Sequence, residues 1–324
     1  MDNHFNLYVS GIYQAEYNGI TIKGEKMHIF AIDIGGTAIK YGVVSTSGQV
    51  IFKDQIPNSA SSQVELLNDL RKIIDYVSPS YEIEGIAFTV PAITDPNSGE
   101  VLSEGSMPFL LGMSIKDELK KTYKKPIHSE NDGNCAALAE VWLGAGKNYN
   151  DLAMVVFGTG VGGAVIKNRK MHSGKQFLSG EFGYLINSCN FKDEEFTIWS
   201  EAGGLYSMRE EFSSCIGSEV TGKQLFDFAE AGHEVAKKIV DNFYNSHAVG
   251  LFNIQYMYDP EIIVLGGAVS SREEFIPEIN KRIDKMCETI KIATAKPILV
   301  KAEHGNDANL IGAVYHYMQK ENMI

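Results

Sequence analysis

Cysteine and positive charge are both scarce in this chain of 324 residues. Its four cysteines, Cys135, Cys189, Cys215 and Cys287, stand far apart and form no Cys-x-x-Cys pair. This spacing offers no framework for a metal site and predicts free thiols in a reducing compartment. Lysine and arginine number 29 against 41 aspartates and glutamates, which gives a formal net charge of −12. Because that charge repels a phosphate backbone, the composition argues against a nucleic-acid partner.

Long hydrophobic runs are missing as well. No apolar stretch approaches the roughly 18 residues that a membrane helix requires, and no basic segment followed by an apolar one opens the chain. We therefore expect a cytoplasmic protein with no membrane partner. Residues 1–26 are polar and aromatic, and we interpret them as a leader of unknown role. With 44% hydrophobic residues, the chain can form two domains of ordinary size.

Two segments share one pattern, an apolar strand, a glycine-rich turn and a second apolar strand. The first, HIFAIDIGGTAIKYGVV, covers residues 28–44, and the second, AMVVFGTGVGGAVIK, covers residues 153–167. The repetition predicts two similar halves of mixed α/β structure. We expect an N-terminal lobe over residues 27–142 and a C-terminal lobe over residues 143–307. The final helix, within residues 308–324, is expected to pack back on the N-terminal lobe.

Both turns suit a nucleoside triphosphate, because glycine lets backbone N–H groups approach phosphates and tolerates positive φ angles. Asp33 precedes the first turn, where its carboxylate can hold the water shell of Mg²⁺. A single hairpin of this kind is more often a plain tight turn. The hypothesis of a nucleotide site therefore depends on the presence of the second, similar hairpin. The candidate nucleotide contacts are Gly35, Gly36, Thr37 and Lys40 in the first hairpin, and Gly158, Thr159, Gly160, Gly162 and Gly163 in the second.

A third glycine pair, Gly266 and Gly267, follows the apolar run IIVL and precedes a helix. The lack of side chains there leaves room for an adenine ring or a ribose. Close packing of a strand against a helix explains the pair equally well, and the sequence leaves both interpretations open.

Candidate sugar contacts and a candidate base lie in polar segments near helix starts. In SENDGNCAALAE, Asn131 and Asp132 stand where N–H dipoles favour a carboxylate, and a simple N-cap is the plainer interpretation. In a phosphotransferase, Asp132 accepts the proton of the attacking hydroxyl and Asn131 bonds a neighbouring hydroxyl. Glu181 and Tyr184 in LSGEFGYL and Glu201 in WSEAGGL are further candidates, although most glutamates are merely solvated.

Five motifs, AIDIGGTAIKYG, ENDGNCAALAE, VVFGTGVGGAV, GEFGY and IIVLGGAVS, resemble in this order those of the ROK family of bacterial sugar kinases and repressors. The resemblance spans about residues 28–320. It implies the actin-like ATPase fold, also called ribonuclease H-like, in which two α/β lobes with a duplicated βαβ core close on ATP and a hexose. It further implies that Asp132 is the catalytic base, that Asn131, Glu181 and Glu201 contact the sugar, and that the protein is a homodimer. The neighbours Ser200 and Trp199 stay open as alternatives to Glu201.

Two departures from the family pattern concern the sugar site. Tyr184 stands where the family usually has a histidine, and the cysteine-rich zinc motif that normally follows is absent. Cys189 alone cannot hold zinc, which takes four ligands, so we predict no structural zinc. Pro91-Ala92 stands where the family usually has Pro-Gly.

The motif GEFGY without zinc ligands and the ending HGNDANLIGAVYHY resemble the corresponding segments of the β-glucoside kinase branch of the family. The resemblance implies an enzyme that transfers the γ-phosphoryl group of ATP to a primary hydroxyl of a β-glucoside such as cellobiose. A glucokinase and an N-acetylmannosamine kinase stay open as alternatives within the same chemistry. A sugar-responsive repressor and a non-catalytic sensor are the other hypotheses, although residues 1–26 are too short and too poor in lysine and arginine for a DNA-binding domain.

Overall fold

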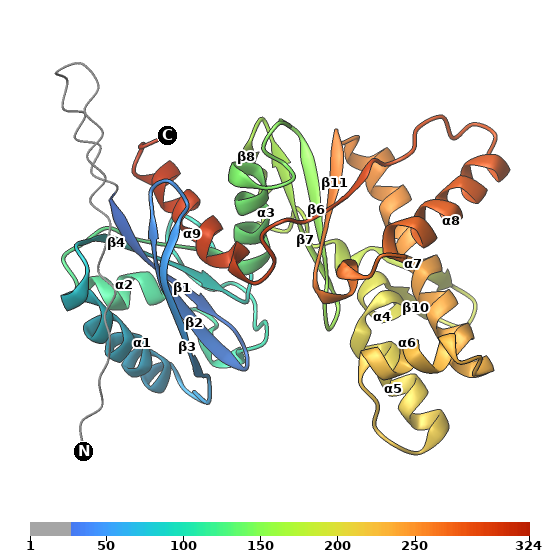
Figure 1. Cartoon of the computed structure of the whole chain (residues 1–324), viewed down its shortest axis with the longest axis horizontal. Helices are drawn as coiled ribbons and strands as arrows, with labels where there is room; N and C mark the ends of the chain where they lie inside the picture. The colour runs from blue at the N-terminus through green and yellow to red at the C-terminus, as the bar shows by residue number, and fades with distance from the viewer. Residues whose placement is uncertain (1–26) are drawn as a thin grey trace.

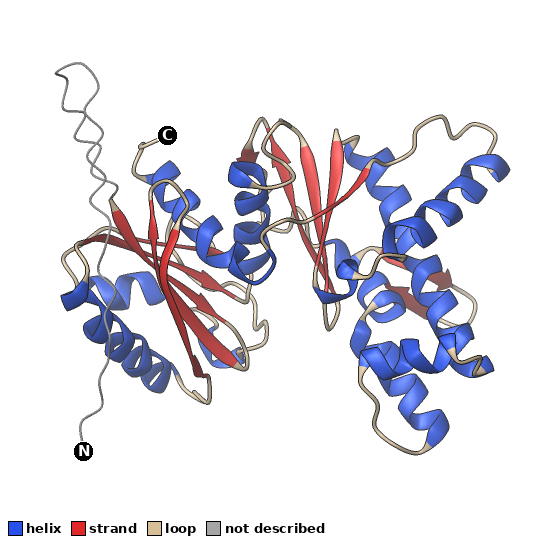
Figure 2. Cartoon of the chain, in the orientation of Figure 1, coloured by secondary structure: helices blue, strands red, loops and turns tan. Residues whose placement is uncertain are grey.

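The computed structural model describes residues 27–324, so the leader expected in residues 1–26 lies outside the described part. Two α/β lobes lie side by side, each built around a five-stranded sheet (Figure 1). Two helices, α3 and α9, lie between the sheets (Figure 2). Their bounds are Asp132–Leu143 for α3 and Ala308–Lys320 for α9.

The first sheet has the strand order β3-β2-β1-β4-β5. Strands β1, β2 and β3 pair antiparallel, and β4 and β5 run parallel to β1. Side chains alternate along β1: Phe30, Ile32 and Ile34 pack on the side of α1, whereas Ile29 and Ala31 pack on the side of α9. Both faces are therefore buried, which explains the nearly continuous apolar run. The bounds are β1 His28–Ile34, β2 Ala38–Ser45, β3 Val50–Pro57, α1 Gln63–Val77, β4 Ile83–Val90, α2 Ile115–Lys120 and β5 Ile127–Asn131.

The second sheet repeats the plan of the first. Its order β8-β7-β6-β11-β12 matches β3-β2-β1-β4-β5, with the same pattern of antiparallel and parallel neighbours. The duplicated core is thereby confirmed, and the two glycine-rich turns, β1–β2 and β6–β7, occupy equivalent places. The bounds are β6 Leu152–Phe157, β7 Val161–Lys167, β8 Lys170–Met171, β11 Ile262–Gly266 and β12 Leu299–Lys301.

Helices cover both faces of the second sheet. One face packs against a large core formed with α7 and its neighbours, and the other packs against α3. A separate two-stranded hairpin, β9 with β10, leads into α4. Its strands are mostly exposed and polar, and no apolar periodicity in the sequence predicted them. The bounds are β9 Ile186–Asn190, β10 Glu195–Ile198, α4 Trp199–Gly203, α5 Leu205–Ile216, α6 Gly222–Glu230, α7 Glu234–Tyr258 and α8 Phe275–Thr289.

The contact between α3 and α9 is unusually close. A Cβ atom built on Gly312 of α9 would lie 1.7 Å from the carbonyl oxygen of Cys135 in α3. Nearby, the rings of Trp142 and Tyr315 stack with centroids 5.2 Å apart. Because α3 packs on one sheet and α9 on the other, this helix pair fixes how the two lobes meet.

Within residues 27–324, none of the helices combines the length and the hydropathy needed to cross a bilayer. The same residues contain no cluster of three or more histidine, cysteine, aspartate or glutamate side chains placed to hold a metal ion.

Candidate active site

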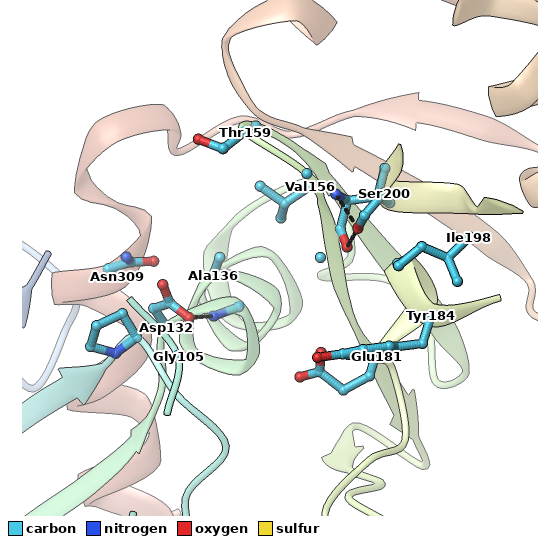
Figure 3. Close-up of a pocket in the computed structure, with 17 residues that line it drawn as sticks. Gly105, Asp132, Ala136, Val156, Thr159, Glu181, Tyr184, Ile198, Ser200 and Asn309 are labelled. Atoms are coloured by element: carbon cyan, nitrogen blue, oxygen red, sulfur yellow. Dashed lines mark hydrogen bonds between the residues drawn. The ribbon is translucent and has the colours of Figure 1, made fainter. Parts of the chain in front are cut away.

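A cavity of about 580 Å³ lies between the two lobes. Asp132 and Asn309, from the first turns of α3 and α9, line one side of it (Figure 3). Thr159 and Ser200 line the other side, together with the loop that carries Glu181 and Tyr184. The cavity thus brings the candidate base opposite the second glycine-rich turn.

Asp132 is the first residue of α3, and its partly buried carboxylate faces the cavity. Its Oδ1 accepts the backbone N–H of Gly133 at 2.8 Å. Burial, together with the nearby carboxylates of Asp33 and Glu181, raises the pKa of Asp132 to about 6, against the lowering effect of the Gly133 bond. A carboxylate with such a pKa is ionised at neutral pH yet basic enough to take a proton from a hydroxyl.

Asn131 occupies the N-cap of α3 and does not line the cavity. Its Oδ1 accepts the backbone N–H of Asn134 at 3.1 Å, and its Nδ2 donates to the carbonyl of Ala92 at 3.2 Å. The capping interpretation is therefore the one that the structure supports. The sugar contact expected of Asn131 stays a prediction, since Nδ2 keeps a second hydrogen that these two bonds do not use.

Glu181 and Tyr184 flank a short 3-10 turn, Phe182–Tyr184, and both line the cavity. Burial raises the pKa of Glu181. Tyr184 is 69% exposed, so it lies at the mouth of the cavity rather than in its floor. Their role as sugar contacts stays a prediction.

Glu201 is exposed and lies outside the cavity lining. Its Oε2 accepts the backbone N–H of Ile198 at 3.3 Å and so caps the start of α4. The neighbouring Ser200 faces the cavity instead, and its Oγ accepts the backbone N–H of Val161 at 3.0 Å. Trp199 is fully buried and donates its indole N–H to His247 Nδ1 at 3.0 Å. The helical turn thus directs Glu201 away from the cavity and Ser200 toward it, and a sugar contact by either residue stays a prediction.

The second glycine-rich turn faces the cavity through Gly158, Thr159, Gly160 and Gly162. The turn is fixed from outside, because the N–H groups of Leu205 and Tyr206 donate to the carbonyls of Gly158 and Thr159. Gly163 lies further along β7 and not in the lining. A side chain there would meet the carbonyl of Met154 and the ring of Phe182, so that glycine serves packing.

The first glycine-rich turn does not line the cavity and is connected to it through Asp33 and Asn309. Gly35, Gly36 and Thr37 form its tip, where Gly36 and Thr37 are exposed, and none of them lines the cavity. Asp33 is buried just before the tip, and its Oδ1 accepts Thr89 Oγ1–H at 2.7 Å and Asn309 Nδ2–H at 2.9 Å.

Lys40, on β2, does not line the cavity either. Its Nζ lies 3.5 Å from Oδ2 of Asp33 and pairs with that carboxylate. Asn309 therefore joins Asp33 to the cavity, while Lys40 balances its charge from the far side.

Gly266 ends β11 and Gly267 follows it, and neither residue lines the cavity. Gly267 has φ +91°, and a Cβ atom there would lie 2.0 Å from the carbonyl oxygen of Phe157. Of the two interpretations that the sequence left open, close packing accounts for this glycine.

Asn309 is a polar residue of the cavity lining that the sequence analysis did not single out. Asn309 bonds Asp33 across 276 positions of sequence, which no local pattern can reveal. The available signal was a polar amide in the first turn of an otherwise apolar helix, in DANLIGAV.

The raised pKa of Asp132 predicts an acidic limb in the activity profile. If the ionised carboxylate is the active form, kcat/KM should rise about tenfold per pH unit below pH about 6 and level off above it. Glu181→Gln should move this limb to lower pH, since it removes one of the charges that raise the pKa. A pH–rate profile of both proteins checks this, and a limb near the ordinary aspartate pKa of about 4 would contradict it.

The model of the ROK family matches residues 29–320 of the chain. A beta-glucoside kinase of Listeria monocytogenes is 32% identical over 301 residues, which cover 91% of this chain and 99% of that protein. The structure of a ROK family protein from Streptococcus pneumoniae TIGR4 in complex with sucrose is 31% identical, with a TM-score of 0.83 over 92% of this chain and all of that one.

A third similar structure is a ROK family glucokinase from Streptomyces griseus in complex with glucose and AMPPNP. It is 22% identical with a TM-score of 0.72, covers 89% of this chain and 98% of that one, and shows the shared fold. Together with the duplicated sheets, these matches confirm the actin-like ATPase fold. The chain therefore belongs to the ROK family, and to the sugar kinases within it.

Proposed function

We propose that this sugar kinase transfers the γ-phosphoryl group of ATP to a primary hydroxyl of a β-glucoside such as cellobiose, with Asp132 as the general base. The observation that carries the proposal is the position of Asp132, at the start of α3, across one cavity from the turn Gly158–Gly162. A base and a phosphate-binding turn on opposite walls are the two parts that in-line transfer requires.

The residues around Asp33 fit Mg²⁺ held through water. Mg²⁺ at kinase sites keeps several waters and takes one or two carboxylates plus the substrate phosphates, so it needs no cage of protein ligands. Asp33, Asp132 and Glu181 concentrate negative charge near one cavity, which a cation bound with ATP would balance. Mg²⁺ would supply charge compensation on the phosphates, and Asp33 would orient its water shell.

The chain's own residues would then act as follows. Asp132 accepts the proton of the sugar hydroxyl as that oxygen bonds to the γ-phosphorus and the bond to ADP breaks. Backbone N–H groups of the turn Gly158–Gly162 bind phosphate oxygens. Glu181 binds sugar hydroxyls, and closure of the lobes excludes water, which otherwise competes as the acceptor.

A β-glucoside is preferred over a single hexose for two reasons. The relative from Listeria that carries the name beta-glucoside kinase matches over nearly its whole length. In addition, Tyr184 lies exposed at the mouth of the cavity, where an aromatic face can stack on a second sugar or an aglycone.

A coupled ADP-release assay over a panel of sugars tests the substrate. We expect turnover of cellobiose, gentiobiose and arbutin at higher kcat/KM than of glucose or N-acetylmannosamine. Tyr184→Ala should raise KM for the disaccharides more than for glucose. Turnover of glucose alone would exclude the β-glucoside assignment while leaving the kinase intact.

The homodimer implied by the family resemblance and the cytoplasmic location expected from the lack of long apolar runs are also part of this proposal. Sedimentation equilibrium of the purified protein tests the first, with a monomer as the contradicting result.

A further inference from the structure

A second cavity, of about 550 Å³, lies outside the active site and has no place in the phosphoryl transfer. Glu130 at the end of β5 lines one side, and the last two turns of α9 line another. The turn between β7 and β8, with Asn168 and Arg169 at φ 51° and 60°, closes it from the C-terminal lobe. Figure 1 shows β8 and the C-terminal end at the same edge of the molecule, away from the β6–β7 turn. The cavity is thus lined by both lobes.

The floor of this second cavity is polar and buried. His316 is 5% exposed, and its Nε2 has no hydrogen-bond partner among the described residues. Its Nδ1 lies 3.7 Å from Oε2 of Glu130, which is 2% exposed. An unpaired polar atom buried this deeply is uncommon in folded proteins, and a bound ligand would satisfy it.

Burial shifts the pKa values of both side chains at this floor toward their neutral forms. Burial raises the pKa of Glu130, and burial with the nearby Lys320 lowers the pKa of His316 to about 3. Near neutral pH the imidazole is therefore neutral, and it offers one donor and one acceptor. Such groups suit hydroxyls, which both donate and accept hydrogen bonds.

The rim, by contrast, is cationic. Lys170 and Lys320 line it, with Lys170 exposed and Lys320 half-buried beside Asn97. The guanidinium of Arg169 is engaged by the carbonyls of Lys147, Tyr149 and Val141, so it fixes the turn rather than binding a ligand. Two lysines therefore remain for an anion, because an ammonium group binds phosphate as a point charge.

Three elements connect this cavity to the active site. Glu130 Oε1 accepts the backbone N–H of Asn131 and Nδ2–H of Asn134, on either side of Asp132. Strand β7 begins at Val161 in the active cavity and ends next to the turn that lines the second one. Helix α9 carries Asn309 in the first cavity and His316 in the second.

We propose that this cavity, lined by Glu130, Lys170, His316 and Lys320, is a regulatory site for a phosphorylated sugar. The phosphate binds the two lysines, and the sugar hydroxyls bind the buried polar floor formed by Glu130 and His316. The ligand bridges the lobes, so its binding alters the affinity of the active site for its sugar. The ligand class is that of the product of the proposed reaction, and to that extent the inference rests on the proposed function.

Isothermal titration of the full-length protein with glucose 6-phosphate tests the site. Saturating AMPPNP and sugar substrate keep the active cavity occupied during the titration. Lys170→Glu should weaken binding by about tenfold or more, since it reverses one charge that meets the phosphate. Lys170→Arg should retain binding, and Lys238→Glu, on the exposed surface of α7, is the control for the same change in net charge.

Two further titrations separate the ligand classes. Glucose and inorganic phosphate should each bind more weakly than glucose 6-phosphate, because each lacks half of the contacts. Inorganic phosphate that binds as tightly as glucose 6-phosphate would reveal a plain anion site and overturn the proposal. Unchanged affinity in Lys170→Glu would overturn it equally. These readouts need no turnover, so they stay interpretable if the kinase assignment itself fails.

Steady-state kinetics test whether binding in the second cavity changes the affinity of the active site for its sugar. Glucose 6-phosphate should change KM for the sugar substrate by about fivefold or more in the wild type, within the usual range of allosteric coupling, and by less in Lys170→Glu. An equal change in both proteins would mean that the ligand acts only at the active cavity.

Discussion

Asp132→Asn should lower kcat by about 10²–10⁴-fold, the usual contribution of a positioned general base. The amide keeps the shape of the carboxylate and can still accept the N–H of Gly133, so sugar binding should change little. Coupled-assay kinetics and titration with sugar separate the two effects. The expected pattern is lost turnover with retained affinity.

The control for this substitution is Asp227→Asn, an exposed aspartate on α6 that pairs with Lys223. It makes the same chemical change far from the cavity and should leave kcat within about twofold, as surface substitutions usually do. Asp132→Asn should also melt no lower than the wild type, because it removes a carboxylate whose charged form is penalised by burial. Full turnover in the variant would exclude Asp132 as the base and remove the main support for the proposed mechanism.

Gly312→Ala should destabilise the protein by about 3 kcal/mol or more, since overpacking against rigid backbone is costly. The added Cβ would lie 1.7 Å from the carbonyl oxygen of Cys135, a backbone atom that can move only if α3 shifts from α9. Alanine gains about 1 kcal/mol of helix propensity over glycine, so the clash must outweigh that gain. Differential scanning calorimetry should show a melting temperature lower by roughly 6–12 °C.

Gly222→Ala provides the matched comparison. Gly222 is the first residue of α6, and nothing lies within 4 Å of a Cβ atom built there. The same substitution should therefore be neutral or stabilise the protein by up to about 1 kcal/mol. Equal melting temperatures for the two variants would show that the α3–α9 contact adapts easily. It would then have no special part in fixing how the lobes meet.

The sequence was sufficient for the features that local patterns encode. The paired strand–turn–strand segments predicted two similar halves, and the structure has two sheets of the same topology. The apolar run IIVL and the helical periodicity after Ala308 agree with β11 and α9. The family followed from the order of the motifs. The hairpin β9–β10 was not predicted, because its exposed polar strands carry no periodic apolar signal.

Side-chain direction at the site was harder to predict. Glu201 and Ser200 are adjacent in sequence, and either could have faced the sugar. One step along a helix turns the side chain by about 100°, so the packing of α4 decides which of them reaches the cavity. Asn131 was ambiguous for a related reason, since an N-cap residue and a substrate ligand use the same amide groups.

The sequence by itself determined the repeated α/β plan, the family, and the candidates Asp132, Glu181 and Tyr184. Only the tertiary structure decided that Asn309 links Asp33 to the cavity, that Ser200 rather than Glu201 lines it, and that Gly267 serves packing. It also revealed the second cavity around Glu130 and His316. The physical reason is that local periodicity follows from backbone geometry over a few residues. A contact between residues hundreds of positions apart exists only after both lobes have formed and the α3–α9 pair has joined them.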